Sequence, residues 1–322
     1  MNGSASRRTI ETATIGAPDG LRVTLVNLGA SIQRIQVPLR QGLVDAVLGY
    51  KNHEDYRYDE AFMGSTLGPF ANRIRGARFE LDNRTYNLDK NDRPAGNCLH
   101  GGSRGFHRRF WDMHEQANAL SLRLDCRVLE EETGFPGNQE ITVIYQIINK
   151  LCLQMDYWGQ SDKATVLSMA NHAYFNLDRR HGNIDSHCLC IDSDLFTPTD
   201  DSAIPTGEIR TVTASDVDLR RPGAISERRF DDTFVLRNGD GGLRKAAELH
   251  SPDSGLRLRV YTTQPALQLY TGDKLDSPFR PRQGVCLEAQ AFPDAPNQPG
   301  FPSARLSAGE TYHQRTVYEF LP

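Results

Sequence analysis

Apolar and polar residues alternate with a period of two along much of this 322-residue chain. The pattern is clear in residues 120–126, 141–147, 151–157 and 256–260. Successive side chains of a β-strand point to opposite faces of the sheet, so each stretch predicts a strand with one buried face.

The predicted strands are separated by turn-forming residues. Residues 79–88 have the pattern of a hairpin whose turn lies at Asp82 and Asn83. The predicted strands follow one another about every 10 to 15 residues, a spacing typical of antiparallel sheets. Helical patterns are weak, and we expect short helical turns only at residues 56–61 and 222–229.

No linker, internal repeat or shift in composition divides the sequence. Its 27 glycines and 17 prolines are spread through the predicted turns. We therefore expect one domain over residues 1–322, with residues 1–8 flexible. The predicted fold class is all-β, a large antiparallel β-sandwich with few short helices.

Composition narrows the classes of partner. The formal net charge of -4 gives no electrostatic reason to expect nucleic acid or an anionic membrane surface. No apolar run approaches the roughly 18 residues of a membrane span, and no apolar segment follows the polar first eight residues as a secretory signal would require. The expected location is the cytoplasm, without a nucleic-acid or membrane partner.

Six cysteines are too few for a chain of this length to be stabilised mainly by disulfide bonds. Cys188 and Cys190 form a C-x-C pair within a predicted strand, but a zinc site needs a second C-x-C or a nearby C-x-x-C, and the sequence has neither. We expect the cysteines to be buried, reduced thiols.

Two glycine-containing segments carry candidate binding groups. In residues 68–74, Asn72 and Arg73 place an amide beside a guanidinium, and both have fixed hydrogen-bond geometry suited to sugar hydroxyls. In the second segment, His100 precedes two glycines, where the backbone can bend sharply and a ligand can approach. Phe106 and Trp111 follow and could offer an apolar face to a pyranose ring. Taken singly, each segment could also be an ordinary surface loop.

Two strand-like segments carry candidate acid and base groups. His172 lies in residues 171–177, a segment that also contains two asparagines and two aromatic residues. This pattern fits either a polar cleft or a core histidine with a satisfied hydrogen bond. Glu288 lies on an apolar strand, where a carboxylate is costly unless it is paired or functional. Burial there would raise its pKa toward neutrality, as a general base requires.

Together and in this order, the segments resemble the aldose 1-epimerases, also called galactose mutarotases. The matching blocks span most of the chain: G-x-x-ANRI (68–74), N-x-LHGG-x-x-GF (97–106), GFPGN (134–138), NH-x-YFNL (171–177), FDD-x-F (230–234), LQLYTG (267–272) and LE-x-Q…PDAPNQP (287–299).

The resemblance implies a β-supersandwich with an open cleft and an enzyme that interconverts the α and β anomers of a free aldose such as glucose or galactose. It implies that Glu288 is the general base, that His172 is the general acid, and that His100 positions the sugar beside them. It further implies that the sugar is bound by Asn72, Arg73, Asp231 and Gln268. Pro69 and Asp232 differ from the arginine and histidine common at these positions in the family, which leaves the preferred sugar open.

The proton chemistry of mutarotation agrees with these roles, since one group must take the proton of the C1 hydroxyl while another protonates the ring oxygen. No cofactor and no metal are expected, and the expected partner is a monosaccharide bound by a monomer or homodimer. Four alternatives stay open. They are a glycosidase or lyase that pairs Glu288 with Asp231, a non-catalytic sugar-binding protein, a zinc enzyme that uses His100, His172 and Glu288, and a mutarotase for a phosphorylated or sulfonated hexose.

Overall fold

The computed structural model describes residues 8–16, 19–115, 119–237 and 241–322, and most of the predicted flexible segment 1–8 lies outside this part of the chain. Strands dominate it, as predicted for an all-β protein. The helices of the described residues are short: α1 (Glu130–Thr133) and the 3-10 turns η1 (His53–Tyr58), η2 (Arg75–Ala77), η3 (Phe106–Arg108) and η4 (Ala295–Asn297).

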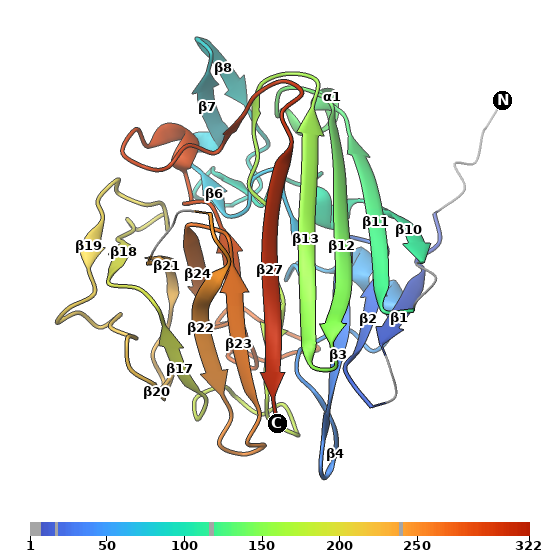
Figure 1. The fold of residues 1–322 in the computed structure, drawn as a ribbon. Coiled ribbons are helices and arrows are strands. Elements are labelled where there is room, and N and C mark those ends of the chain that lie inside the picture. The colour runs from blue at the N-terminus through green and yellow to red at the C-terminus, as the bar shows by residue number, and fades with distance from the viewer. Residues whose placement is uncertain (1–7, 17–18, 116–118, 238–240) are drawn as a thin grey trace.

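A nine-stranded antiparallel sheet forms one side of the molecule (Figure 1). Its long central strands each carry an alternating buried face, which follows from the period-two pattern of the sequence. In spatial order it contains β10 (Asp112–Glu115), β11 (Ser121–Val128), β12 (Gln139–Asn149), β13 (Cys152–Ser161), β27 (Tyr312–Leu321), β23 (Arg257–Thr262), β22 (Arg244–His250), β17 (Cys188–Ile191) and β20 (Gly223–Ala224).

Two further sheets pack against it. The six-stranded sheet has the order β16 (Tyr174–Phe175), β25 (Val285–Gln290), β24 (Ala266–Tyr270), β21 (Asp231–Val235), β18 (Leu195–Thr197) and β19 (Arg210–Thr211). The four-stranded sheet consists of β1 (Thr12–Gly16), β2 (Arg22–Val26), β3 (Ser31–Leu39) and β4 (Gly42–Asp45). One continuous hydrophobic core contains residues of all three sheets, so the sheets form a sandwich.

Four small strand pairs complete the fold, and the β6–β9 pair contributes Arg73 and Leu99 to the wall of the site described below. They are β5 (Thr66–Leu67) with β15 (Ala170–Asn171), β6 (Arg73–Ile74) with β9 (Cys98–Leu99), β7 (Arg78–Leu81) with β8 (Arg84–Asn87), and β14 (Thr165–Val166) with β26 (Arg305–Leu306). All four pairs are antiparallel.

The strand predictions are confirmed for all four alternating stretches, which correspond to β11, β12, β13 and β23, and for the hairpin at Asp82 and Asn83. The helical predictions are less accurate. The first coincides in part with η1, whereas residues 222–229 contain β20 and a turn but no helix. The expectation of one domain over residues 1–322 stays a prediction.

All six cysteines are free thiols, as expected. Four of them are buried, but Cys188 and Cys190 are only half-buried, because both lie on the less buried face of β17.

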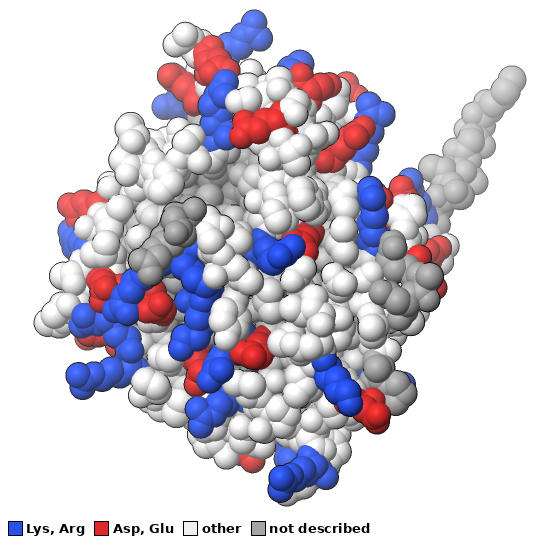
Figure 2. All heavy atoms as spheres, viewed as in Figure 1, with Lys and Arg blue, Asp and Glu red and all other residues white. Residues whose placement is uncertain are grey.

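Charged side chains of both signs are interspersed on the face seen in Figure 2. Within the described residues, no helix is long and apolar enough to cross a membrane.

The Tyr145 side chain links the nine-stranded sheet to the turn between β2 and β3 and to β5. Its hydroxyl donates to the carbonyl oxygen of Ala30 at 2.7 Å and lies 3.2 Å from Thr66 Oγ1. Tyr145→Phe should lower the free energy of unfolding by about 1–3 kcal/mol, because it leaves buried polar groups short of a partner. Tyr261→Phe is the matched control, since that hydroxyl bonds Glu319 near the surface. Urea unfolding measures both, and equal effects would contradict the buried link.

Candidate active site

A cavity of 430 Å³ opens beside the six-stranded sheet. Its volume lies within the range of about 300–1,000 Å³ common for small-molecule sites. Six of the seven residues expected from the sequence line it: Asn72, Arg73, His100, His172, Asp231 and Glu288. A larger cavity of 680 Å³ shares Tyr50 and Phe279 with this one but contains none of the seven.

Strand pairing brings Arg73 and His100 to the same wall of the cavity. In the β6–β9 pair, Arg73 lies opposite Leu99, so the following residue, His100, is adjacent to Asn72. The His100 backbone N–H donates to the Asn72 carbonyl at 3.0 Å, and the Asn72 backbone N–H donates to His100 Nδ1 at 3.1 Å. The two segments therefore fix each other.

This second hydrogen bond determines the tautomer of the His100 ring. Because Nδ1 accepts a hydrogen bond from the Asn72 backbone N–H, the ring proton of neutral His100 must lie on Nε2. The backbone turns sharply here, with φ of 52° at His100 and 83° at Gly101. A side chain at Gly101 would place its Cβ 2.1 Å from the Gly68 carbonyl oxygen, so the turn requires glycine.

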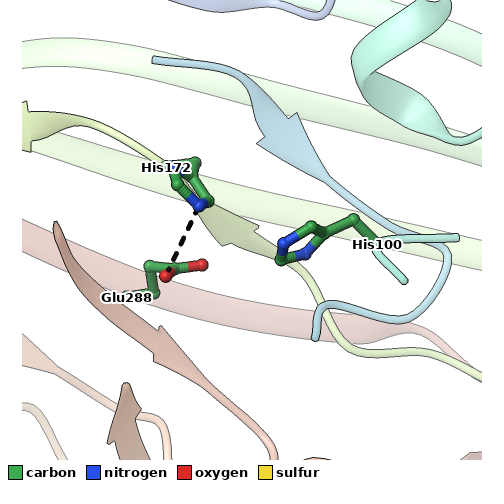
Figure 3. A group of neighbouring side chains, drawn as sticks. All are labelled: His100, His172 and Glu288. Carbon is green, nitrogen blue, oxygen red and sulfur yellow. Dashed lines mark ion pairs between the residues drawn. The ribbon is translucent and has the colours of Figure 1, made fainter. Parts of the chain in front are cut away.

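Glu288 and His172 form the centre of the site (Figure 3). His172 Nε2 lies 3.7 Å from Glu288 Oε1, and both side chains are at most 5% exposed. Glu288 lies on β25, where Leu287 points into the core. His172 follows β15, and its backbone N–H donates to the Ser65 carbonyl at 2.9 Å. Glu288 is therefore held within a strand, and His172 is held by the backbone directly after one.

Burial shifts the proton affinities of the two groups in opposite directions. It raises the pKa of Glu288 well above 4.5, and the charge of Asp231 raises it further, whereas Arg73 lowers it. Burial lowers the pKa of His172 to about 4. It also lowers the pKa of His100 well below 6.5, with smaller contributions in the same direction from the neighbouring histidines and Arg73. Burial therefore favours a neutral imidazole beside a protonated carboxyl group.

Arg73 is held by two carboxylates. Its Nε donates to Asp92 at 3.1 Å, and its Nη1 lies 3.5 Å from Asp231. Gln268 does not line the cavity and lies behind Asp231, to which its Nε2 donates at 2.7 Å. Its amide oxygen accepts a hydrogen bond from Thr233. The structure thus gives Gln268 a position from which it orients Asp231.

The apolar face expected from Phe106 and Trp111 is not at the cavity. Both rings are at most 1% exposed and pack edge to face with each other in the core, where Trp111 Nε1 donates to the Phe106 carbonyl. The aromatic side chains that do line the cavity are Phe62, Tyr174, Tyr270, Phe279, Tyr50 and Tyr58. The motif blocks contained Tyr174 and Tyr270, but no sequence pattern distinguished Phe62.

His100, His172 and Glu288 each offer one ligand atom, and these atoms lie within 4.8 Å of one another. A metal-bound neutral histidine keeps its ring proton on the nitrogen that does not bind the metal. Nδ1 of His100 already accepts a backbone hydrogen bond, so the ring cannot keep that proton there while Nε2 binds an ion. The donor set does not fit a metal centre as it stands.

Pro69 and Asp232, the two residues that depart from the family pattern, do not line the cavity. Asp232 accepts a hydrogen bond from the Asp231 backbone N–H, and burial, with the charge of Asp231, raises the pKa of its carboxyl group to about 6. Pro69 lies against Gly101, in the turn after His100. Their effect on the choice of sugar stays an open expectation.

Comparisons with known proteins agree with this site. A family model described as aldose 1-epimerase matches residues 11–319. Galactose mutarotase of Bos taurus is 37% identical over 94% of this chain and 92% of that protein. Aldose 1-epimerase of Escherichia coli K12 is 33% identical over the same shares of the two chains.

Solved structures show the same architecture. An aldose epimerase homologue from C. elegans superimposes with a TM-score of 0.91 and 29% identity over 97% of this chain and 99% of that chain. Galactose 1-epimerase from Lactobacillus acidophilus gives a TM-score of 0.85 and 25% identity over 99% and 97% of the two chains. The fold and the activity are those of an isomerase of the mutarotase type. The chain belongs to the aldose 1-epimerase family, which confirms the family, fold class and enzyme class expected from the sequence.

The raised pKa of Glu288 predicts a pH-dependent cost in stability. At pH values between the pKa of a free glutamate and the raised pKa of Glu288, the folded state binds more protons than the unfolded state. The free energy of unfolding therefore falls by up to about 1.4 kcal/mol for each unit that the pH rises in this range. Glu288→Gln removes this dependence. Its free energy of unfolding should therefore increase relative to the original protein as pH rises from 5 to 8.5, as measured by urea unfolding. A difference that does not change with pH would contradict the shift.

Proposed function

We propose that this chain interconverts the α and β anomers of glucose or galactose, with Glu288 as general base, His172 as general acid and His100 as a positioning group. The observation that carries the proposal is the 3.7 Å approach of His172 to Glu288 inside a cavity large enough for a monosaccharide. The exposed fraction of each of these two side chains is at most 5%, although both line the cavity.

Ring opening needs two proton transfers. The Glu288 carboxylate takes the proton of the C1 hydroxyl, and the His172 imidazolium protonates the ring oxygen as the bond from that oxygen to C1 breaks. The open-chain aldehyde rotates about the C1–C2 bond. The two residues then exchange roles, and attack of the same oxygen on the other face of C1 closes the ring.

The burial of the pair supports this sequence of steps. The pair can take two forms that contain the same number of protons. In the first, Glu288 is a carboxylate and His172 an imidazolium; in the second, Glu288 is a carboxylic acid and His172 a neutral imidazole. The first form acts on the closed ring, and the second form is what remains when the ring has opened. Because burial favours the second form, it stabilises the state that accompanies the aldehyde. Arg73 lowers the pKa of Glu288 and thereby keeps the carboxylate form accessible.

The charges of the cavity favour a neutral sugar over a phosphorylated or sulfonated one. Four carboxyl groups line the cavity, from Glu60, Asp231, Asp276 and Glu288, against two permanent cations, Arg73 and Lys274. Arg73 is already held by Asp92 and Asp231. An anionic substituent would therefore meet a cavity wall with an excess of negative charge.

The same geometry argues against a glycosidase that uses Glu288 with Asp231. Asp231 is held by Arg73 and Gln268, while Glu288 Oε1 lies 3.7 Å from the His172 imidazole. We further propose that the reaction needs neither cofactor nor metal. The chain would then act in the cytoplasm on a free monosaccharide, as a monomer or homodimer.

Glu288→Gln and His172→Asn should each lower kcat by about 10²–10⁴-fold, because each removes one proton transfer. Polarimetry of freshly dissolved α-glucose and α-galactose measures the rate. Glu248→Gln and His114→Asn make the same changes outside the cavity and should leave kcat unchanged.

Near-normal turnover in either active-site variant would refute the assignment of acid and base. Sugar binding without any acceleration over buffer would instead indicate a binding protein. Hydrolysis of aryl glycosides that is lost in Glu288→Gln would indicate a glycosidase, and loss of activity after exhaustive chelation would indicate a metal enzyme.

Arg73→Ala should mainly raise KM, by about tenfold to a hundredfold, because a charged hydrogen bond to the sugar contributes about 1.5–3 kcal/mol. Arg73→Lys keeps the charge but not the planar guanidinium, so its KM should lie between that of the original protein and that of Arg73→Ala. Steady-state kinetics on the better aldose separates KM from kcat. A pure loss of kcat at constant KM would contradict a binding role.

A further inference from the structure

One apolar side chain touches three imidazole rings at this site. The ring centroid of Phe62 lies 4.5 Å from that of His100, 4.8 Å from that of His107 and 5.7 Å from that of His172. Phe62 is half-buried and forms part of the cavity wall. Its ring therefore covers part of the surface that His100 and His172 would otherwise expose to the cavity they all line.

The backbone of Phe62 has a φ of 56°, in the left-handed region. Bulky residues are rarely found there, since the side chain crowds the backbone, and such strain persists only where the surroundings impose it. One such constraint is the Tyr174 hydroxyl, which donates to the carbonyl oxygen of the preceding residue, Ala61, at 3.1 Å.

Asp59 supplies the stronger constraint. Its carboxylate accepts the backbone N–H of Ala61 at 3.0 Å and that of Met63 at 2.7 Å, the two residues that flank Phe62. It also accepts the Tyr50 hydroxyl at 2.9 Å. Asp59 is only 6% exposed, and a carboxylate so buried is costly unless its hydrogen bonds stabilise it. These three bonds hold the short loop in the form that directs Phe62 to the histidines.

Exclusion of water explains the proton affinity of the neighbouring rings. His100 and His172 are at most 5% exposed, and burial is the largest cause of the lowered pKa of each. Several titratable groups surround His172: Glu288 and Cys286 on β25, Tyr270 on β24, Tyr174 on β16, and the two histidines His100 and His107. Phe62 is the non-titratable ring in contact with all three imidazoles.

We propose that Phe62 is a positioning residue whose ring keeps water from His172 and His100, and that the Asp59 carboxylate holds it in place. Phe62 then determines how readily His172 exchanges its proton with Glu288 and the sugar. The proposal rests on the proposed function only for its kinetic consequence, since the environment of His172 can be measured without a substrate.

Phe62→Asn is the decisive variant. Asparagine tolerates positive φ, so the backbone strain is relieved while the apolar ring is replaced by a small polar group. NMR of protein labelled at histidine Cε1, assigned with His172→Asn, follows the titration of His172. Its pKa should rise from about 4 toward 6.5, by about one unit or more. Phe62→Leu restores apolar bulk and should return the pKa most of the way to the original value.

Phe279→Asn is the matched control. Phe279 lines the same cavity but is in edge contact with Tyr50 and not with a histidine ring. The same substitution there should leave the titration of His172 unchanged. An unchanged titration in folded Phe62→Asn, or an equal shift in Phe279→Asn, would overturn the proposal.

Asp59→Asn tests the constraint on the loop. It should shift the His172 titration in the same direction as Phe62→Asn, and the double variant should shift it no further, because both changes act through one ring. Additive shifts would show that Asp59 does not act through Phe62.

Kinetics separates this proposal from the function on which it rests. In Phe62→Asn the acid limb of kcat/KM should move upward with the NMR titration, and kcat should fall more than KM changes. A shift in the titration without a shift in the limb would overturn the proton-exchange role. An original protein that accelerates mutarotation of no aldose would contradict the proposed function, and the NMR titration would still decide whether Phe62 shields His172.

Discussion

The site depends on the burial of one carboxyl group against one imidazole. In this environment neither group is readily charged alone, so Glu288 and His172 together keep a single transferable proton over a wide pH range. Mutarotation begins and ends with a neutral sugar and needs one group to give a proton while the other takes one. A buried pair with one proton meets that requirement in both directions.

The sandwich supplies the rigidity that this pair needs. Leu287 anchors β25 in the core beside Glu288, and the β5–β15 pair fixes the backbone at His172. The β6–β9 pair sets His100 beside Asn72 through two reciprocal hydrogen bonds. The short loop at Phe62 is held by side-chain hydrogen bonds instead. Glu288 thus lies on a strand and His172 directly after one, while a strained loop contacts the histidines.

Much of this could be predicted from the sequence. The period-two alternation located the long strands, and Glu288 was recognisable because a carboxylate inside an apolar strand requires an explanation. The aromatic wall was predicted wrongly: Phe106 and Trp111 are apolar residues in a loop-like segment, and only the packing shows that both enter the core. Phe62 could not be recognised at all, since its positive φ and its contacts with three histidines arise from segments distant in the sequence. Likewise, the motif containing Gln268 did not reveal that this side chain lies behind Asp231.

The pH dependence of kcat/KM for the unmodified protein tests the central claim most directly, since it reports the protonation of the free pair. We predict a bell-shaped profile. Its acid limb lies near pH 4, where His172 takes up a proton and the pair then holds two. Its alkaline limb lies well above 4.5, the pKa of a free glutamate, where Glu288 loses the last proton of the pair. An acid limb near 6.5, as for a solvated imidazole, or a rate that no longer falls at high pH, would contradict it.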